Sequence, residues 1–265
     1  MNGRLQLTQA AALLPHLPDS AMAVFARYIV ERDPGSTAML ADDGSAWVLG
    51  GPWAGRPEAP SYWAYAQDQA ALDAALHWLE QHAPVADVAL CNQPADELAI
   101  ASGWQIGWDT HLCLDGPGPG PGPAASPIPI VNFEQACQQG TPMHPELAAQ
   151  GYADYPALIR DFGRLDRFFG AIHEGQLVAM AECNLAAGSH ISIQAVSTAS
   201  TLRNRGLGKA VVGHAANWIH TQGKQAHYLA STDNHASIAL ARACGFNQAM
   251  TLPYLYRPTQ TPSPS

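Results

Sequence analysis

The stretch Arg203-Asn204-Arg205-Gly206-Leu207-Gly208 decides how this sequence is interpreted. An apolar, β-leaning run over residues 191–196 precedes it, and apolar residues then recur at helical spacing from Leu207 to Ile219. A strand therefore leads through a glycine loop into a helix. Because the first amides of a helix have no partner inside it and carry partial positive charge, this loop predicts a site for phosphate or another anion.

Two other kinds of phosphate-binding loop fit the stretch poorly. A P-loop needs glycine where Arg203 stands and serine or threonine where Ala210 stands. A dinucleotide-binding loop needs a third small residue where Val211 stands and an acidic residue about 20 residues further on. Residues 222–232 contain no acid. The spacing therefore argues against both.

The loop resembles the Arg/Gln-x-x-Gly-x-Gly/Ala motif of the GNAT superfamily of N-acetyltransferases, whose backbone amides hold the pyrophosphate of acetyl-CoA. Residues 196–202 are similar to the family's exit from its fourth strand. Residues 234–246 begin with Asn and end with Gly-Phe, like the helix that closes the family's cofactor groove. The resemblance covers residues 128–258 and implies an α+β fold with a central, mostly antiparallel sheet flanked by helices.

The resemblance also implies which residues contact acetyl-CoA. The glycine loop would hold the pyrophosphate, a backbone amide near Ser197 would hold the acetyl carbonyl, and Asn234 would bond the pantetheine or cap its helix. The pantetheine would lie between the fourth and fifth strands where these splay apart. The expected cofactor-binding set is Val196, Ser197, Thr198, Arg203, Asn204, Arg205, Gly206, Leu207, Gly208, Lys209 and Asn234.

The sequence departs from the family where a proton donor is expected. The family often has a tyrosine seven residues after the Asn of the closing helix, and Ala241 occupies this position. Tyr254 and Tyr256, on a predicted last strand, are the candidate general acids. Protonation of the thiolate by water is the alternative, because a thiolate is a good leaving group.

Glu182 is the candidate general base, because it ends an otherwise apolar strand where burial would raise its pKa. The alternative is a solvent-facing residue at a strand end. His190 and His173 are weaker candidates, since a single histidine at a strand end or turn is usually a surface residue.

The first half of the chain resembles the second. Residues 92–104 align with residues 234–246 at a constant offset, with Asn at the start and Gly before an aromatic residue at the end. The first half has no Gly-x-Gly before its corresponding helix, and Asp68 near that helix start would compete with phosphate for its amides. The pattern predicts a tandem of GNAT-like domains in which the N-terminal copy is degenerate.

The Gly/Pro repeat between the halves marks the expected domain boundary, since it offers no side chains to bury. The predicted organisation is a degenerate domain over residues 1–115, a linker over 116–127, an acetyl-CoA-binding domain over 128–258, and a disordered tail over 259–265.

Periodicity and turn residues predict the main elements. In the first half they are helices at 4–15, 19–32 and 69–81, a hairpin of strands 37–41 and 46–50, and a strand at 85–90. In the second half they are a strand at 128–131, helical segments at 146–149 and 155–161, and a hairpin of strands 169–172 and 176–182.

Composition narrows the class of protein. A net charge of −9 with only 13 Lys and Arg residues argues against a nucleic-acid partner. No apolar run reaches the roughly 18 residues of a membrane span, and the N-terminus does not resemble a signal peptide, so we expect a cytoplasmic protein with no membrane partner. Scattered histidines and cysteines predict neither a metal site nor a disulfide framework; the cysteines are Cys91, Cys113, Cys137, Cys183 and Cys244.

The expected function is therefore transfer of the acetyl group of acetyl-CoA to a primary amine of a small molecule or an amino-acid-like acceptor, by direct attack. The alternatives are a non-catalytic sensor that binds acyl-CoA and an assembly module without a ligand. The expected oligomeric state is a monomer or a homodimer.

Overall fold

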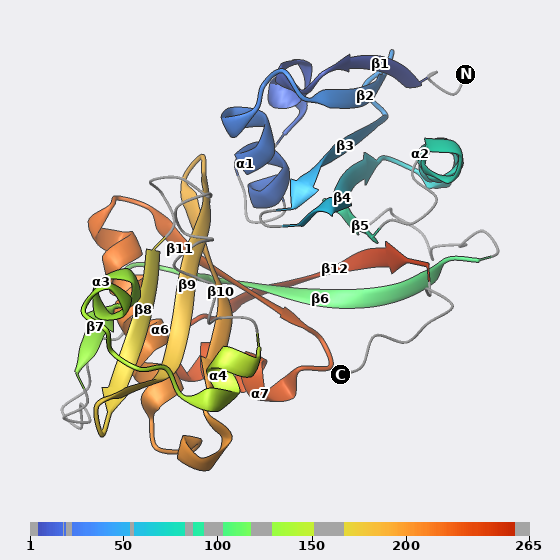
Figure 1. The fold of residues 1–265 in the computed structure, drawn as a ribbon. Helices are drawn as coiled ribbons and strands as arrows, with labels where there is room; N and C mark the ends of the chain where they lie inside the picture. Colours follow the sequence, from blue (N-terminus) through green and yellow to red (C-terminus); the bar gives the residue numbers. More distant parts are fainter. Residues whose placement is uncertain are drawn as a thin grey trace. The chain divides into compact units, whose positions relative to one another are not determined.

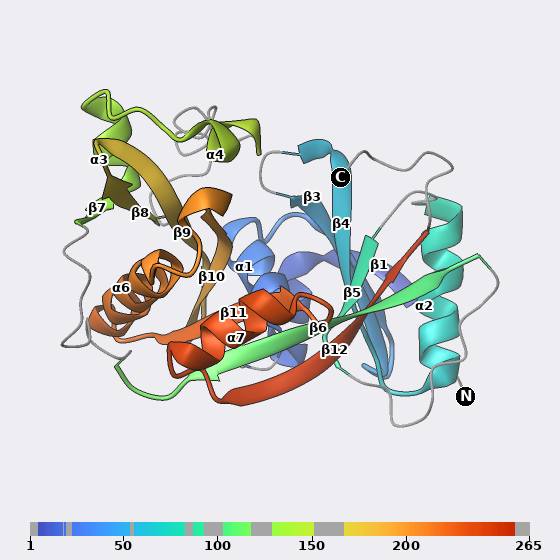
Figure 2. The ribbon, with the colours of Figure 1, turned by 90° about the horizontal axis from the view of Figure 1, so that it is seen from below.

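The computed structural model describes residues 5–17, 19, 23–53, 56–82, 87–92, 103–117, 129–150 and 167–257. These residues form a mixed α+β fold with a large, mostly antiparallel sheet (Figures 1 and 2). The chain divides into a first unit, Met1–Asp109 with Thr251–Ser265, and a second unit, Thr110–Met250. The strands β6 (Gln105–Leu114) and β12 (Gln248–Tyr256) each begin in one unit and end in the other.

The remaining elements of the first unit are β1 (Leu5–Gln9), η1 (Ala10–His16), α1 (Val24–Arg32), β2 (Thr37–Ala41), β3 (Ala46–Trp53), β4 (Arg56–Ala66), α2 (Gln69–His82) and β5 (Asp87–Leu90). Those of the second unit are β7 (Ile130–Asn132), α3 (Phe133–Gln138), α4 (Pro145–Ala149), β8 (Arg167–His173), β9 (Gln176–Ala187), β10 (His190–Thr198), η4 (Ser200–Leu202), α6 (Leu207–Thr221), β11 (Gln225–Ser231) and α7 (His235–Ala243).

Both units arrange their strands in the same way. In the first, β1 to β4 are antiparallel neighbours, β5 runs parallel to β4, and β12 lies next to β5. In the second, β7 to β10 are antiparallel neighbours, β11 runs parallel to β10, and β6 lies next to β11. The strand beside the fifth position therefore comes from the other half of the sequence in each unit.

Each unit has its own apolar core. In the first, α2 packs Leu72, Leu76 and Leu79 against β2 to β5, and Leu255 of β12 completes the cluster. In the second, α6 and α7 cover one face of the sheet, where Val211 of α6 meets the inward side chains of β9, β10 and β11. The helices α3 and α4 cover the opposite face at β8 and β9 (Figure 2).

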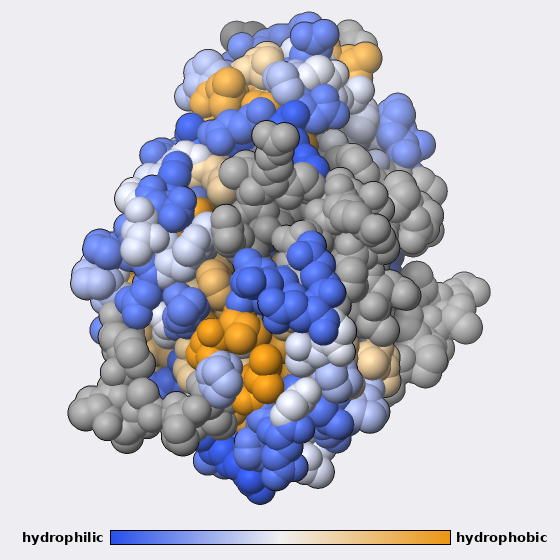
Figure 3. Space-filling model, turned by 60° about the vertical axis from the view of Figure 1, so that its left-hand side comes forward, coloured by the Kyte–Doolittle hydropathy of each residue, from blue (hydrophilic) through white to orange (hydrophobic). Residues whose placement is uncertain are grey.

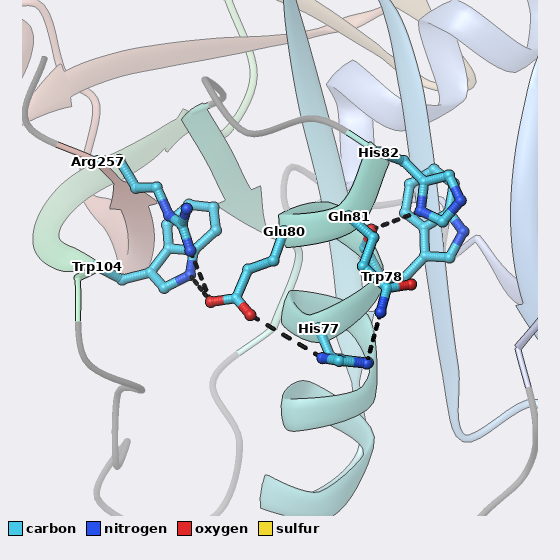
Figure 4. A network of polar contacts seen from close by, with 7 residues as sticks. All are labelled: His77, Trp78, Glu80, Gln81, His82, Trp104 and Arg257. Carbon is cyan, nitrogen blue, oxygen red and sulfur yellow. Dashed lines mark hydrogen bonds and ion pairs between the residues drawn. The ribbon is translucent and has the colours of Figure 1, made fainter.

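The polar contacts of Arg257 fix the end of β12 within the first unit (Figure 4). Its Nη2 donates to Oε1 of Glu80 in α2 at 2.6 Å, and its guanidinium lies 4.6 Å from the ring centroid of Trp104. Trp104 Nε1 also donates to the same carboxylate oxygen, at 3.3 Å. These contacts and the core position of Leu255 make the C-terminal strand part of the N-terminal unit.

Most predicted elements are confirmed, including both hairpins, the helix α2 and the segment α4. The helix predicted at 4–15 is wrong. Residues Leu5–Gln9 form a strand paired with β2, and a short 3-10 helix follows. The sheet partner overrides the local helical spacing, because a strand can satisfy its backbone groups on the neighbouring strand and Pro15 removes a donor from any longer helix.

The predicted domain ranges stay a prediction. The compact units divide within β6 and β12, whereas the predicted boundary lay in the Gly/Pro segment. Residues 118–127 of that segment, the helical segment predicted at 155–161 and the tail at 259–265 lie outside the described residues.

The surface is largely hydrophilic where Figure 3 shows it, with apolar side chains gathered in small areas. Among the described residues, the large apolar side chains that are exposed are Leu7, Leu14, Trp108 and Met250. Within the described ranges, no helix combines the length and the apolar character that crossing a membrane requires.

We predict that Leu255→Ala lowers the free energy of unfolding of the first unit by about 2–5 kcal/mol, because it leaves a cavity at a fully buried position. Chemical denaturation followed by tryptophan fluorescence measures this, since six of the seven tryptophans lie within residues 1–109. Leu7→Ala, at a side chain that is 72% exposed, is the matched control. Equal stability of the two variants would contradict the assignment of β12 to this core.

Candidate functional site

The helix α6 begins at a glycine whose conformation leaves its amide end open. Gly206 is the N-cap residue, with φ of 80° in the left-handed region, and Ala210 N donates to its carbonyl oxygen at 2.9 Å. A Cβ added at Gly206 would meet no atom within 4 Å. Because glycine has no side chain, the N-cap residue itself offers no acceptor to the first amides of α6. This is the local geometry that binds anions.

Basic side chains lie around this helix end. Arg203, Arg205 and Lys209 are all exposed, and Arg203 Nε donates to the carbonyl oxygen of Thr198 at 3.2 Å. The sequence thus places three cations within one turn of the positive end of the helix. Their charge adds to that of the helix dipole and favours a ligand with more than one negative charge.

The lead-in to the loop is held by the helix α4. The carboxylate of Glu146 accepts from the amide and the hydroxyl of Ser200 at 2.7 and 2.6 Å, and these bonds lower its pKa. Gln150 Oε1 accepts from the hydroxyl of Ser197 at 2.8 Å. Leu207 is buried in the core of the second unit. The loop therefore starts from a fixed strand end and finishes on a buried anchor.

The strands beside the loop diverge. The parallel pairing of β10 with β11 runs from His190 and Gln225 to Ile193 and Tyr228, although β10 continues to Thr198. This is the splay that the resemblance implies between the fourth and fifth strands.

A bulge in β10 follows directly. The pairing with β9 shifts register between Gln194 and Ser197, and Ala195 has φ of 46°. Holding an alanine in the left-handed region costs about 1–2 kcal/mol, so the surrounding sheet must impose it. A bulge leaves one residue outside the ladder and turns its amide away from the partner strand. The backbone from Val196 to Thr198 is therefore well placed to offer a donor to a ligand in the splay.

The corresponding helix end of the first unit is closed. Asp68 Oδ1 accepts from Ala71 N at 2.9 Å and so caps α2, as its sequence position predicts. The strands β4 and β5 stay together, because Asn92 accepts from Ala66 N at 3.3 Å and donates to Ala66 O at 2.8 Å. The carboxylate of Asp68 and the side-chain amide of Asn92 thus occupy the backbone groups that a phosphate or a pantetheine would need.

The remaining predicted cofactor contacts lie around α7. Asn234 Oδ1 accepts from Ser237 N at 3.1 Å and caps α7, which is one of its two expected roles. A Cβ at Gly208 would lie 3.3 Å from Leu240 of α7 and 3.5 Å from the hydroxyl oxygen of Thr198. The second glycine of the loop therefore permits close packing of α6 on α7. Asn204, with φ of 62°, shares the left-handed turn.

The predicted catalytic residues fall in different units. Glu182 lies on β9 opposite Gln194, directly before the bulge, and is half-buried. Tyr254 and Tyr256 lie in the part of β12 that belongs to the first unit, with ring centroids 5.7 Å apart. The roles of all three stay predictions.

A hydroxyl pair in the second unit was missed from the sequence. Tyr228 OH and Ser237 Oγ are 2.8 Å apart, and burial raises the pKa of Tyr228, so its phenol stays protonated. Ser237 lies one helical turn before Ala241 on the same side of α7. Tyr228 is the last residue of β11 paired with β10, at the start of the splay. Because Tyr228 lies in a strand of mostly apolar residues, its sequence context did not indicate that it would lie at the start of the splay.

A polar row across the sheet was also missed. His111 Nδ1 lies 3.1 Å from His227 Nε2, and His227 Nδ1 lies 3.2 Å from the hydroxyl of Ser192. Gln194 Nε2 donates to the same hydroxyl at 3.3 Å. Asn184 of β9 pairs with Ser192 in register and continues the row. These residues lie on four strands, with two of them on β10. Their spacing in the sequence could therefore not indicate that they are neighbours in the fold.

The comparisons with known proteins agree with this geometry. Residues 132–246 match the model of the acetyltransferase (GNAT) family. The matched segment contains both the open end of α6 and the splay between β10 and β11. No curated protein matches the sequence.

Solved structures share the fold of the chain as a whole. A Drosophila protein has a TM-score of 0.65 at 13% identity over 96% of this chain and 98% of its own. A GCN5-related N-acetyltransferase from Sphaerobacter thermophilus has a TM-score of 0.52 at 15% identity over 96% of both chains. Another from Kribbella flavida has a TM-score of 0.55 at 15% identity over 81% of this chain and 87% of its own.

We predict that His227 makes the second unit sensitive to acid. The pKa of His227 lies well below its ordinary value of about 6.5. Burial is the largest cause, and electrostatic interaction with His111 and His190 lowers the pKa further. Below about pH 6.5 the unfolded chain therefore binds a proton that the folded chain does not, and stability falls as the pH drops. By pH 5 the expected loss is about 2 kcal/mol.

Chemical denaturation at pH 7 and pH 5 measures this loss in the protein and in His227→Gln, which cannot take up the proton. The difference between the two pH values should shrink in the variant. An unchanged difference would show that His227 does not carry the acid sensitivity.

Proposed function

We propose that this protein transfers the acetyl group of acetyl-CoA to a primary amine of a small molecule or an amino-acid-like acceptor, by direct attack. The observation that carries the proposal is the open, basic N-terminus of α6 beside the diverging strands β10 and β11. Acetyl-CoA supplies an activated acyl thioester and a diphosphate, and this end of the second unit suits both.

The residues have separate roles in this proposal. The amides from Gly206 to Lys209 bind the diphosphate, with Arg203 and Arg205 beside them. A backbone amide between Val196 and Thr198 polarises the thioester carbonyl. Glu182, half-buried beside the bulge, accepts the proton of the attacking amine through water.

The proton for the thiolate has two possible donors. Tyr228 is our first choice, because it lies in the second unit at the start of the splay and Ser237 can return a proton to it. The pair lies one turn from Ala241, where the family often has its tyrosine. Tyr254 and Tyr256 are the second choice, from the first unit.

We also propose that the first unit is a degenerate copy of the second. The identical order of strands supports a duplication. Asp68 caps the helix that would have held the diphosphate, and Asn92 holds together the strands that would have opened for the pantetheine. The first unit is thus expected to support the second without binding acetyl-CoA.

Gly206→Asp should abolish measurable binding of acetyl-CoA while leaving the protein folded, because it places a carboxylate at the diphosphate site. Isothermal calorimetry measures the binding. Gly175→Asp is the matched control, since Gly175 also has positive φ and open space around its Cβ position but lies in the β8–β9 turn. Both variants carry the same strain and charge, so only a difference in binding identifies the site.

The same titration separates the alternatives. An assembly module without a ligand would give no heat with acetyl-CoA in the unmodified protein. A sensor would bind acetyl-CoA and release no free thiol with any primary amine. If Gly206→Asp retained its affinity for acetyl-CoA, the assignment of the diphosphate site to this loop would be wrong.

Tyr228→Phe should lower kcat for thiol release by about tenfold or more, with the affinity for acetyl-CoA unchanged, because only the proton donor is removed. The double variant Tyr254→Phe with Tyr256→Phe tests the second choice in the same assay. A loss of kcat in the double variant but not in Tyr228→Phe would assign the role of general acid to Tyr254 or Tyr256 on β12. Activity that survives in both would leave water as the proton source.

A further inference from the structure

Among the described residues, the buried polar row of the second unit ends on an atom without a hydrogen-bond partner. The row runs across β6, β11, β10 and β9 through His111, His227, Ser192 and Asn184, which are 8%, 0%, 0% and 7% exposed. The first three are linked by hydrogen bonds. Asn184 Oδ1 is buried and has no hydrogen-bond partner among the residues that the structure describes. Within the part of the second unit that the structure describes, no other buried side-chain polar atom is left in this state.

A buried amide oxygen without a partner is costly. Leaving such a group unsatisfied costs about 1–3 kcal/mol, and native proteins satisfy nearly all of them. The neighbours on the same strand, Ala181 and Cys183, face the core under α6, so Asn184 faces the other side of the sheet. A methyl group or a leucine at this position would remove the cost. The unpaired oxygen therefore points to a hydrogen-bond donor that the described residues do not supply.

The surroundings of Asn184 indicate what that donor is. Glu182 lies two residues away on the same face of β9, and its partner Gln194 directly precedes the bulge at Ala195. Both are partly exposed, so the buried row borders on solvent-accessible side chains next to the proposed acetyl site. Carboxylate and amide oxygens accept hydrogen bonds, and burial keeps His227 neutral. The face therefore favours a ligand that donates, such as a hydroxyl or an ammonium group.

We propose that Asn184 is a specificity-determining residue of the acceptor subsite, and that the acceptor is a primary amine carrying a second hydrogen-bond donor, a hydroxyl or an ammonium group. This inference rests on the proposed acetyl transfer. Asn184 Oδ1 accepts from the second donor, and the row behind it holds Ser192 and so the sheet face in place. The amine to be acetylated lies toward Glu182 and the bulge.

Three primary amines of equal size test the inference: n-butylamine, aminopropanol and diaminopropane. Thiol release should be at least tenfold more efficient, in kcat/KM, with the two amines that carry a second donor. In Asn184→Leu this preference should disappear, because kcat/KM falls with the two amines that carry a second donor, and the affinity for acetyl-CoA should be unchanged. The variant's Tm should not fall, because an unsatisfied acceptor has been replaced by an apolar group of similar size.

Asn184→Ala provides a second variant if leucine disturbs packing. Gln225→Ala is the control, since Gln225 bonds Asp115 at the far end of β11 and should keep the preference. A preference retained in both Asn184 variants, or an equal loss with all three amines together with a lower Tm, would overturn the inference.

Thermal shift in the presence of CoA separates this inference from the proposed function. If no amine releases thiol but diaminopropane or aminopropanol raises Tm only when Asn184 is present, the subsite stands and acetyl transfer falls. If thiol is released without the preference, acetyl transfer stands and the subsite falls. If neither response occurs, both are overturned.

Discussion

The open end of α6 is the constraint on which the candidate site depends. Many helices begin with a side chain that accepts from their first amides, and glycine at this position costs only a few tenths of a kcal/mol relative to such a cap. Gly206 provides none, and the left-handed turn at Asn204 and Gly206 brings the chain into the helix from the side of the basic residues. No side chain at the N-cap competes with an anion for the first amides of α6, and an anion bound there would stabilise them.

The contrast between the units supports this explanation from within one chain. Their strands follow the same order, so both could have had a splay and an open helix end. The first unit instead has Asp68 on its helix amides and Asn92 across its strand ends. These are ordinary ways to satisfy polar groups in a folded domain. The second unit leaves the same groups open and accepts a strained alanine at the bulge, which a purely structural domain has no reason to keep.

The sequence could predict those parts of the fold that depend on neighbouring residues. The glycine loop, the helix after it and the Asp68 cap are local, and the structure has all three. It could not predict that β6 and β12 divide between the units, because pairing between distant strands leaves no mark in local spacing. The strand at Leu5–Gln9 was mistaken for a helix for the same reason, since its pairing with β2 decides its conformation. The polar row was hidden inside apolar strands.

The polar row lies on the side of β10 that is turned away from the core under α6. Alternation sends Ile191 and Ile193 toward α6 and Ser192 to the opposite face. Buried imidazoles and a hydroxyl are tolerable in this position because they satisfy one another. Such a network holds the strands in one register, since a slip of one residue would put its members into the core under α6. The register in turn sets the position of the bulge at Ala195, and hence of the amide that the proposed reaction needs.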